Sequence, residues 1–250
     1  MAEISIKAET LFHLGVFNFT NSYLLSLIVM GIFVSLTIWL KDKLALIPGK
    51  MQSILELLTE QILQLMDTIL GSRFLSEKYF PLVATIFLFV LLSNWLGLLP
   101  GTGSLGLTHE IYKHGETEHV LIPLLRAPTS DLNFTIALAV ITVFSIQILG
   151  IMSIGFFKYV GKFINFHGPI NFFVGILELI GEISKIVSLS FRLFGNIFAG
   201  EVLLTVVLFL VPYIVPLPFL GLEIFVGFVQ ALVFSMLTLV FLKIATAEHH

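Results

Sequence analysis

The segment SLSFRLFGNIFAGE, Ser188–Glu201, places an arginine in one of the most apolar parts of the chain. The residues on either side of it, 170–187 and 202–210, are mostly Leu, Ile, Val and Phe. An arginine at the centre of a bilayer costs about 2.5–3.5 kcal/mol on insertion scales, so such a residue usually faces a partner or a water-filled path. The segment therefore predicts a membrane helix in which Arg192 takes part in ion movement.

The composition of the whole chain is that of a membrane protein. Of its 250 residues, 57% are hydrophobic and 12% are charged, whereas soluble domains contain about 25% charged residues. We therefore expect an all-α polytopic membrane protein that forms one membrane domain, residues 1–250. The net charge of −3 gives no indication of nucleic-acid binding, and the absence of cysteine excludes disulfides, thiolate metal sites and cysteine nucleophiles.

Runs of about 20 apolar residues, the length that crosses a bilayer, divide the chain into segments. The expected segments are an outer lead-in at 1–22, spans at 23–40, 79–99 and 131–157, an amphipathic surface helix at 51–72, an outer polar loop at 100–130 and a helical hairpin at 170–246. The lead-in lacks the basic region and apolar core of a signal peptide. Asp131 is the expected N-cap of the third span.

The stretch 170–210 is too long for a simple span. As a helix its 41 residues would measure about 60 Å, roughly twice the hydrocarbon thickness of a bilayer. The helix must either break near Gly181 or Gly195 or lie steeply inclined, and we favour the inclined arrangement. The last helix, about 220–246, would then lean with it as an antiparallel hairpin.

Basic residues near the span ends predict the orientation of the chain. If the spans alternate, eight basic residues fall on one side and three on the other. The first group is Lys41, Lys43, Lys50, Arg73, Lys78, Lys158, Lys162 and Lys243, and the second is Lys7, Lys113 and Arg126. This asymmetry predicts an outer N-terminus and a cytoplasmic C-terminus.

Helical spacing sorts the polar residues of the hairpin into two groups. One face of the long helix carries Glu178, Lys185, Ser188, Arg192, Asn196 and Ala199. Glu201 follows Arg192 by nine residues, about 900° of rotation, and therefore points to the opposite side, towards Glu223 and Gln230 of the last helix. We expect two polar entrances that do not join. Glu178, Ser184 and Ser188 would line the cytoplasmic one, and Glu201, Glu223 and Gln230 the outer one.

These segments resemble subunit a of the F-type ATP synthase. The resemblance rests on SLSFRLFGNIFAGE, on the hairpin that follows it and its FVQALVFSMLTLVFL helix, and on FVLLSNWLGLLPG and APTSDLNFTIALA. It covers nearly the whole chain in order. It implies a proton-translocating stator with two offset half-channels to a c-ring, further partners in b-type peripheral-stalk subunits and the lipid bilayer, and no cofactor. Nucleotide chemistry would lie on other subunits, so the chain would not be an enzyme on its own.

The resemblance also implies residue roles. Arg192 would face the ion-carrying carboxylate of each passing c-subunit, attract its deprotonated form and block a direct proton leak. Asn196 is the motif asparagine, Glu201 the acid of the outer half-channel, and Gln230 the glutamine of the last helix. Glu223 stands where the family often has histidine. Glu178 and Ser184 match the cytoplasmic half-channel.

Several alternatives remain open at this stage. Arg192 could hold helices together by pairing with a glutamate, and the subunit could move sodium instead of protons. A secondary antiporter would show internal repeats, but no second copy of the arginine motif is present. The spacing of His109, His114 and His119 does not favour a metal site. We expect a bacterial plasma (inner) membrane, with an organelle energy-coupling membrane as the alternative.

Overall fold

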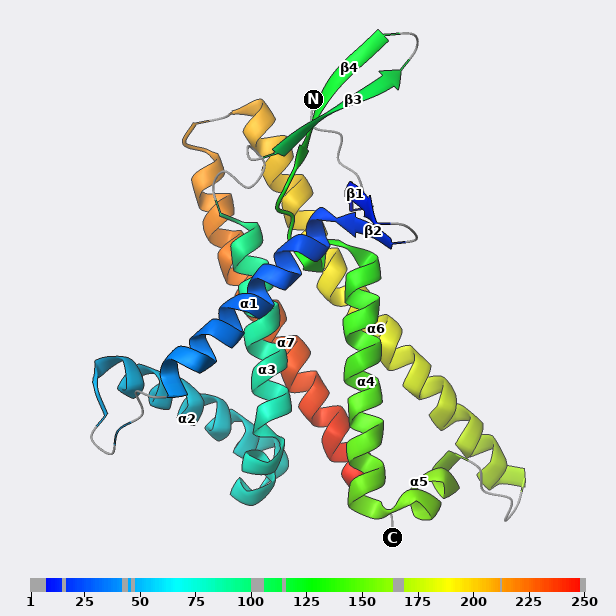
Figure 1. The fold of residues 1–250 in the computed structure, drawn as a ribbon. Helices are drawn as coiled ribbons and strands as arrows, with labels where there is room; N and C mark the ends of the chain where they lie inside the picture. The colour runs from blue at the N-terminus through cyan, green and yellow to red at the C-terminus, as the bar shows by residue number, and fades with distance from the viewer. Residues whose placement is uncertain are drawn as a thin grey trace. The chain divides into compact units, whose positions relative to one another are not determined.

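The computed structural model describes residues 8–14, 17–41, 45, 48–99, 106–113, 116–163, 169–211 and 213–247. Within these ranges the chain is nearly all helical (Figure 1), and five of its helices are long and apolar enough to cross a membrane. The expected all-α polytopic fold is therefore confirmed. Lys7 and Lys43 of the orientation argument, and His114 of the histidine series, lie outside the described residues.

The chain divides into two compact units, each assembled from three separate segments. The first unit contains Met1–Leu44, Leu88–Thr135 and Leu193–Ala231, and the second contains Ala45–Phe87, Ile136–Arg192 and Leu232–His250. The helices that contribute to the units are α1 (Asn21–Lys41), α2 (Lys50–Leu70), α3 (Arg73–Gly97), α4 (Leu132–Ile154), α5 (Phe156–Phe163), α6 (Pro169–Leu210) and α7 (Pro216–Thr246).

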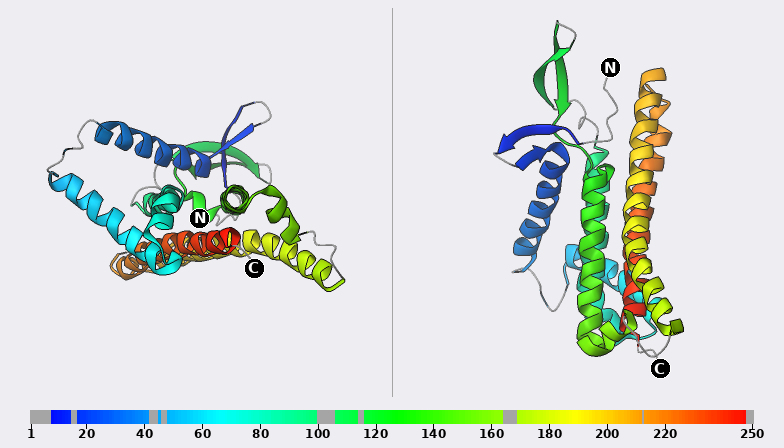
Figure 2. Two further views of the ribbon diagram at one scale, coloured as in Figure 1. Left: turned by 90° about the horizontal axis from the view of Figure 1, so that it is seen from below. Right: turned by 90° about the vertical axis from the view of Figure 1, so that its right-hand side faces the viewer.

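Two antiparallel β-ribbons belong to the first unit. Strand β1 (Thr10–Leu14) pairs with β2 (Phe17–Thr20), and β3 (Gly106–Lys113) pairs with β4 (Glu116–Pro123). Both ribbons lie at the same end of the unit (Figures 1 and 2). The outer polar loop expected at 100–130 thus contains a paired hairpin and a short 3-10 turn, η1 (Pro128–Ser130), because cross-strand pairing satisfies backbone groups that a polar loop would leave to water.

Helix α1 is anchored at its N-terminal end. It packs against η1 and β2, and the side chain of Asn21 donates a hydrogen bond to the Pro123 carbonyl at 3.2 Å. Leu25 and Val29 are buried, whereas Ile38 near the other end is 66% exposed. An apolar helix with most of its surface exposed is what a lipid-facing span requires. The helix extends the predicted span 23–40 by two residues and one residue at its ends.

The third helix begins earlier than its hydropathy indicates. We expected a span at 79–99, whereas α3 starts at Arg73 and ends at Gly97, with Pro81 inside it. Its first turns contain Arg73, Ser76, Glu77 and Lys78. Because these residues are polar, an apolar run marks only the later part of the helix. Helix α3 therefore begins before its apolar run, and the polar side chains of its first turns form contacts there.

The third predicted span, 131–157, is divided in the structure. The Asp131 carboxylate accepts the backbone N–H of Asn133 at 2.9 Å, which confirms the predicted N-cap of α4. Helix α4 ends at Ile154, and Gly155 has a φ of +92°, which only glycine adopts without strain. The chain turns there and continues as α5, so the single helix expected through residue 157 is wrong at its C-terminal end.

Helix α6 runs without interruption from Pro169 to Leu210, 42 residues, and passes through Gly181 and Gly195. The alternative of a broken helix is therefore wrong, and a steep inclination stays a prediction. In the first unit, the second part of α6 and the first part of α7 lie side by side and run in opposite directions (Figures 1 and 2). Helix α7 starts at Pro216, before the predicted residue 220, because prolines fit the first turn of a helix.

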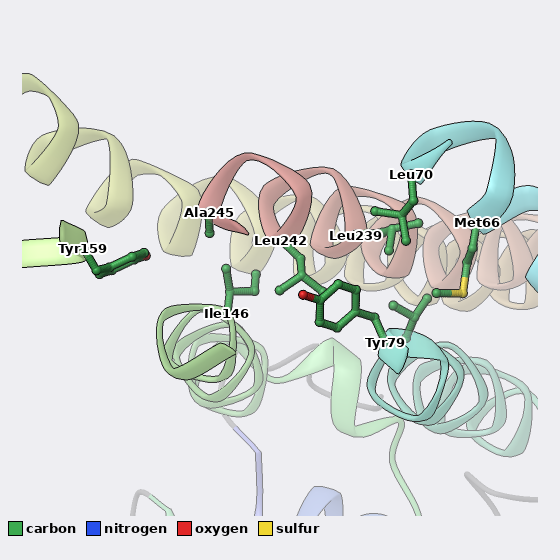
Figure 3. Close-up of a cluster of buried hydrophobic side chains, with 9 residues drawn as sticks. Met66, Leu70, Tyr79, Ile146, Tyr159, Leu239, Leu242 and Ala245 are labelled. Carbon is green, nitrogen blue, oxygen red and sulfur yellow. The ribbon is translucent and has the colours of Figure 1, made fainter. Parts of the chain in front are cut away.

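The core of the second unit gathers side chains from α2, α3, α4, α5 and α7 (Figure 3). It contains Met66, Leu70, Tyr79, Val83, Ile146, Tyr159, Leu239, Leu242 and Ala245. Only the C-terminal half of α2 takes part, since Ile54, Leu57 and Leu58 are more than half exposed. The amphipathic helix predicted at 51–72 is thus present as α2, Lys50–Leu70, and its placement on a membrane surface stays a prediction.

Candidate ion-translocation site

Arg192 lies in the second unit with an exposed side chain. Its Nη2 donates to the Ser188 hydroxyl one turn earlier on α6, at 3.3 Å. Among the residues that the structure describes, no carboxylate lies within ion-pairing distance of Arg192. Within the described residues, Arg192 therefore does not form the structural ion pair with a glutamate that was one of the alternatives.

The other predicted residues of the cytoplasmic entrance lie on the same helix. Ser184 and Ser188 are exposed, and the Ser184 hydroxyl donates to the Ile180 carbonyl at 2.9 Å. Glu178 is half-buried. Within the second unit, α6 therefore presents a short series of hydroxyl groups that leads along the helix to the guanidinium.

In the first unit, Glu223 lies against Gly200. Glu223 is 4% exposed although it is a carboxylate. A Cβ added to Gly200 would overlap the Glu223 carboxyl group, so the missing side chain of α6 makes the space into which the acid of α7 fits. The carboxylate of Glu201, the next residue on α6, is near enough to repel that of Glu223 electrostatically.

Glu201 is paired with Arg126, which precedes η1. The Arg126 Nε lies 3.4 Å from Oε1 of Glu201 and also donates to the Ser130 hydroxyl at 3.1 Å. Arg126 is 8% exposed. Within the described residues the other carboxylate oxygen of Glu201, Oε2, is buried and has no hydrogen-bond partner. One oxygen of this acid is thus held by a cation, and the other remains available to a proton.

Asn94 fixes α7 next to this pair of acids. Its amide nitrogen donates to the Gly227 carbonyl at 2.9 Å, and its amide oxygen accepts the Thr129 hydroxyl at 2.6 Å. A Cβ on Gly227 would lie 3.1 Å from the Cβ of Asn94, so the glycine allows the close approach of α3 and α7. The Trp95 indole N–H donates to the Ile224 carbonyl, beside Glu223, at 3.1 Å.

The remaining predicted residues lie apart from these contacts. Gln230, two turns after Glu223 on α7, is half-buried, and Asn196 is exposed on α6. In the described part of the chain, neither side chain has a hydrogen bond or ion pair. The first unit therefore brings together Glu201 and Glu223, and it leaves Gln230 and Asn196 free for other groups.

Sequence reasoning missed Arg126 and the role of Gly200. Arg126 entered only the count of basic residues, because nothing in its neighbourhood shows that it meets a residue 75 positions later. Gly200 stands directly before Glu201, and a glycine beside a membrane acid was the one available signal. The segment FVLLSNWLGLLPG contributed only to the family resemblance, and the hydrogen bonds of its Asn94 and Trp95 to α7 could not be predicted from the sequence.

Two carboxylates and one guanidinium in a partly buried space can hold one exchangeable proton. With both acids ionised the cluster carries one net negative charge, and a single proton removes it. Carboxylates that share a low-dielectric space with one cation exchange such a proton without a cofactor. The cluster in the first unit therefore contains the kinds of groups that a proton relay uses.

Comparison with known proteins places this chain in a family. Residues 23–243 match the family described as ATP synthase A chain. The chain is 34% identical to ATP synthase subunit a of Campylobacter curvus (strain 525.92) and of Campylobacter fetus subsp. fetus (strain 82-40), in both cases over 100% of each chain. This chain belongs to the ATP synthase subunit a family. It is also 39% identical to ATP synthase subunit a of Campylobacter jejuni subsp. doylei (strain ATCC BAA-1458 / RM4099 / 269.97), over 80% of this chain and 79% of the relative.

Membership of the subunit a family agrees with the fold. Subunit a is the membrane-embedded, ion-translocating part of the ATP synthase, and the five apolar helices make this chain a multi-pass protein of a bacterial membrane. The family match includes every predicted site residue from Glu178 to Gln230. Residues 1–22 precede it.

Proposed function

We propose that this chain is the stator subunit that carries protons to and from the c-ring of a rotary F-type ATP synthase, through two offset half-channels separated by Arg192. The observation that carries the proposal is the exposed guanidinium of Arg192, without a carboxylate partner among the described residues, on a helix of mostly apolar residues. Such a charge is costly in a bilayer unless an outside group compensates it. An ionised carboxylate on a passing c-subunit would be that group.

Arginine suits this role because it does not release its proton at any physiological pH. It cannot carry a proton, and it favours the ionised form of a carboxylate that comes near it. A c-subunit acid would therefore lose its proton on reaching Arg192 and take up another after leaving it. Since the arginine stays charged, protons cannot pass through it from one half-channel to the other.

The outer half-channel would deliver protons through Glu201 and Glu223. The support is their proximity at Gly200 and the ion pair between Glu201 and Arg126 at 3.4 Å. Gln230 and Asn196 would continue the path towards the ring. Glu223 takes the place of a histidine common in the family, and a second carboxylate can transfer protons in the same way.

The cytoplasmic half-channel would release protons past Ser188, Ser184 and Glu178. Along α6, Glu178 lies about 21 Å before Arg192 and Glu201 about 13 Å after it, at 1.5 Å per residue. The two routes would thus meet the ring at different depths. A membrane potential supplies about 2.3 kcal/mol per proton for each 100 mV, and several protons per turn would drive rotation and ATP synthesis.

The proposal extends to location and partners. The chain would reside in the bacterial plasma membrane with its N-terminus outside and its C-terminus in the cytoplasm. It would contact the c-ring along the Arg192 face of α6, b-type stalk subunits through other helices, and lipid elsewhere, while nucleotide chemistry takes place on other subunits.

Glu201→Gln in the complete ATP synthase tests the outer half-channel. Gln keeps the size of the side chain and removes its capacity to bind a proton, so passive proton flux and ATP synthesis in membrane vesicles should fall about tenfold or more. Glu56→Gln, on the exposed face of α2, is the matched control and should leave both rates unchanged.

Wild-type flux in the Glu201→Gln enzyme would contradict the assignment. Synthesis that requires sodium and ignores the proton gradient would instead support a sodium-translocating subunit. Ion exchange by the chain without a c-ring would indicate an antiporter.

A further inference from the structure

A polar network in the second unit joins four helices around Glu182. The Gln147 amide nitrogen of α4 donates to Oε2 of Glu182 at 2.7 Å, and the Lys185 ammonium donates to Oε1 at 2.6 Å. The Tyr159 hydroxyl of α5 donates to the amide oxygen of Gln147. The Lys185 nitrogen also lies 5.2 Å from the centre of the Phe241 ring on α7. Both oxygens of Glu182 therefore accept from donors, one of them positively charged.

The fold is built to place Tyr159 in this network. Gly155, with its positive φ, turns the chain so that α5 returns towards α4. A Cβ on Gly150 would lie 2.6 Å from the Tyr159 ring, so glycine leaves the space that the ring occupies. Burial, together with the nearby Glu182 and Glu178 carboxylates, raises the pKa of Tyr159 to about 12. The phenol stays protonated and donates to Gln147 at any physiological pH.

Lys185 and Arg192 differ sharply in their surroundings. They lie seven residues apart on α6, about two turns, and by helical spacing they share one face. The Lys185 side chain is 21% exposed and is paired with Glu182, whereas Arg192 is exposed and bonded only to a hydroxyl among the described residues. Of these two cations, only Arg192 presents an uncompensated charge.

We infer that Glu182 is a positioning residue that holds Lys185 against α7 and neutralises it, so that Arg192 alone attracts the carboxylate of a c-subunit. The inference rests on the proposed function. A free ammonium two turns from Arg192 would be a second attractive point, about 10 Å away along the helix. If Lys185 held a c-subunit carboxylate in its ionised form, that carboxylate would take up its next proton more slowly after leaving Arg192. Glu182 itself does not carry the transported proton, since both its oxygens are engaged.

A pair of substitutions in the complete ATP synthase separates this role from a purely structural one. Glu182→Gln removes the anion and leaves Lys185 uncompensated, and proton-driven ATP synthesis should fall about tenfold, which corresponds to about 1.4 kcal/mol. Glu182→Gln combined with Lys185→Gln removes both charges and should restore synthesis to within about twofold of wild type. A role of Glu182 as proton carrier predicts no such rescue, and a purely structural role lowers the amount of assembled complex but leaves the synthesis rate per assembled complex unchanged.

Two outcomes of this pair overturn the inference: wild-type synthesis in Glu182→Gln, or an equally low rate in the double variant. If Glu182→Gln fails to assemble, the inference is tested on the wild-type complex by measuring how fast its lysines react with a membrane-permeant amine reagent. Lys185 should react at least about tenfold more slowly than the exposed Lys158, and equal rates overturn the inference. The proposed function is tested by a different variant: coupled ATP synthesis in Arg192→Ala would contradict it, whatever the result for Glu182.

Discussion

At the scale of single residues, the carboxylates of Glu201 and Glu223 depend on neighbours that have no charge or that lie far away in sequence. Gly200 contributes only the absence of a side chain, and the buried carboxyl group of Glu223 occupies that space. Arg126 contributes a cation to Glu201 from 75 residues earlier. Substitutions at these two neighbours therefore test the relay without altering either acid.

Gly200→Ala should displace Glu223 from α6, because the new Cβ overlaps its carboxyl group. A misplacement of about 1 Å in a reacting group can lower a rate by up to about a hundredfold, so we expect proton flux through the membrane sector to fall at least about tenfold. Flux is measured in vesicles that contain equal amounts of assembled complex. Gly221→Ala, where an added Cβ has nothing within 4 Å, is the control and should be neutral. Equal flux in the two variants would show that Glu223 does not need its present position.

Arg126→Gln should leave Glu201 without its cation. Glu201 is partly exposed, so the pair contributes about 1 kcal/mol, and we expect proton uptake to slow by about fivefold. Adding Arg126→Gln to Glu201→Gln should cause no further loss, since both changes break one interaction. Ser130→Ala, which removes the hydroxyl that accepts a hydrogen bond from Arg126, should have little effect. Fully additive losses would mean that Arg126 acts on the outer path independently of Glu201.

The sequence was informative about residues whose type is itself unusual. A charge in an apolar helix is conspicuous, and Arg192, Glu201 and Glu223 were all identified in this way. Arg126 lies in a polar region where another basic residue is unremarkable, and a glycine in a membrane helix is common. Their roles depend on contacts between distant segments, which helical spacing within one segment does not reveal.

At the scale of elements, the corner between α2 and α3 is held by charges. Arg73, at the start of α3, bonds Glu60 at 2.7 Å, Asp67 at 3.1 Å and Glu77 at 3.2 Å. Gly71 ends α2 with a φ of +73°, and the Lys243 ammonium of α7 donates to the Ile69 carbonyl at 2.6 Å. Helix α2 is thus fixed at its C-terminal end, while its other half remains exposed.

This corner should loosen in acid. The hydrogen bond from Arg73 lowers the pKa of Glu60 below 4.5, and hydrogen bonds from Ser76 and then Arg73 lower the pKa of Asp67 below 3.8. Since both pKa values are depressed by folding, the stabilisation is present above about pH 4.5 and is lost as the pH falls through the depressed values. Hydrogen exchange in residues 60–70, corrected for the intrinsic pH dependence, should show decreasing protection below pH 4.5. Arg73→Gln should abolish most of this pH dependence, and an unchanged dependence would contradict the assignment.

The apolar helices were predictable, whereas element ends and strands were not. The spans at 23–40, 79–99 and 131–157 correspond to α1, α3 and α4, because long apolar runs have few other solutions in a membrane. The early start of α3 and the turn at Gly155 depend on polar contacts and a positive φ. The ribbon of β3 and β4 mixes charged, polar and apolar residues, and a loop was the simpler interpretation of that pattern.

At the scale of the whole molecule, α6 and α7 each belong to both compact units. Arg192 is assigned to one unit and Glu201, nine residues later, to the other, on a single helix without a break. The sequence alone left open whether this helix is continuous or broken.

Arg192→Ala in the complete ATP synthase is the most direct test of the central claim that one exposed guanidinium separates two proton routes. Ala removes the charge and leaves the helix intact, so the complex should assemble with its c-ring while proton-driven ATP synthesis falls at least about a hundredfold. Arg73→Ala, which removes an arginine from the corner between α2 and α3, is the matched control and should retain synthesis. Coupled synthesis at the wild-type rate in assembled Arg192→Ala complexes would contradict the account.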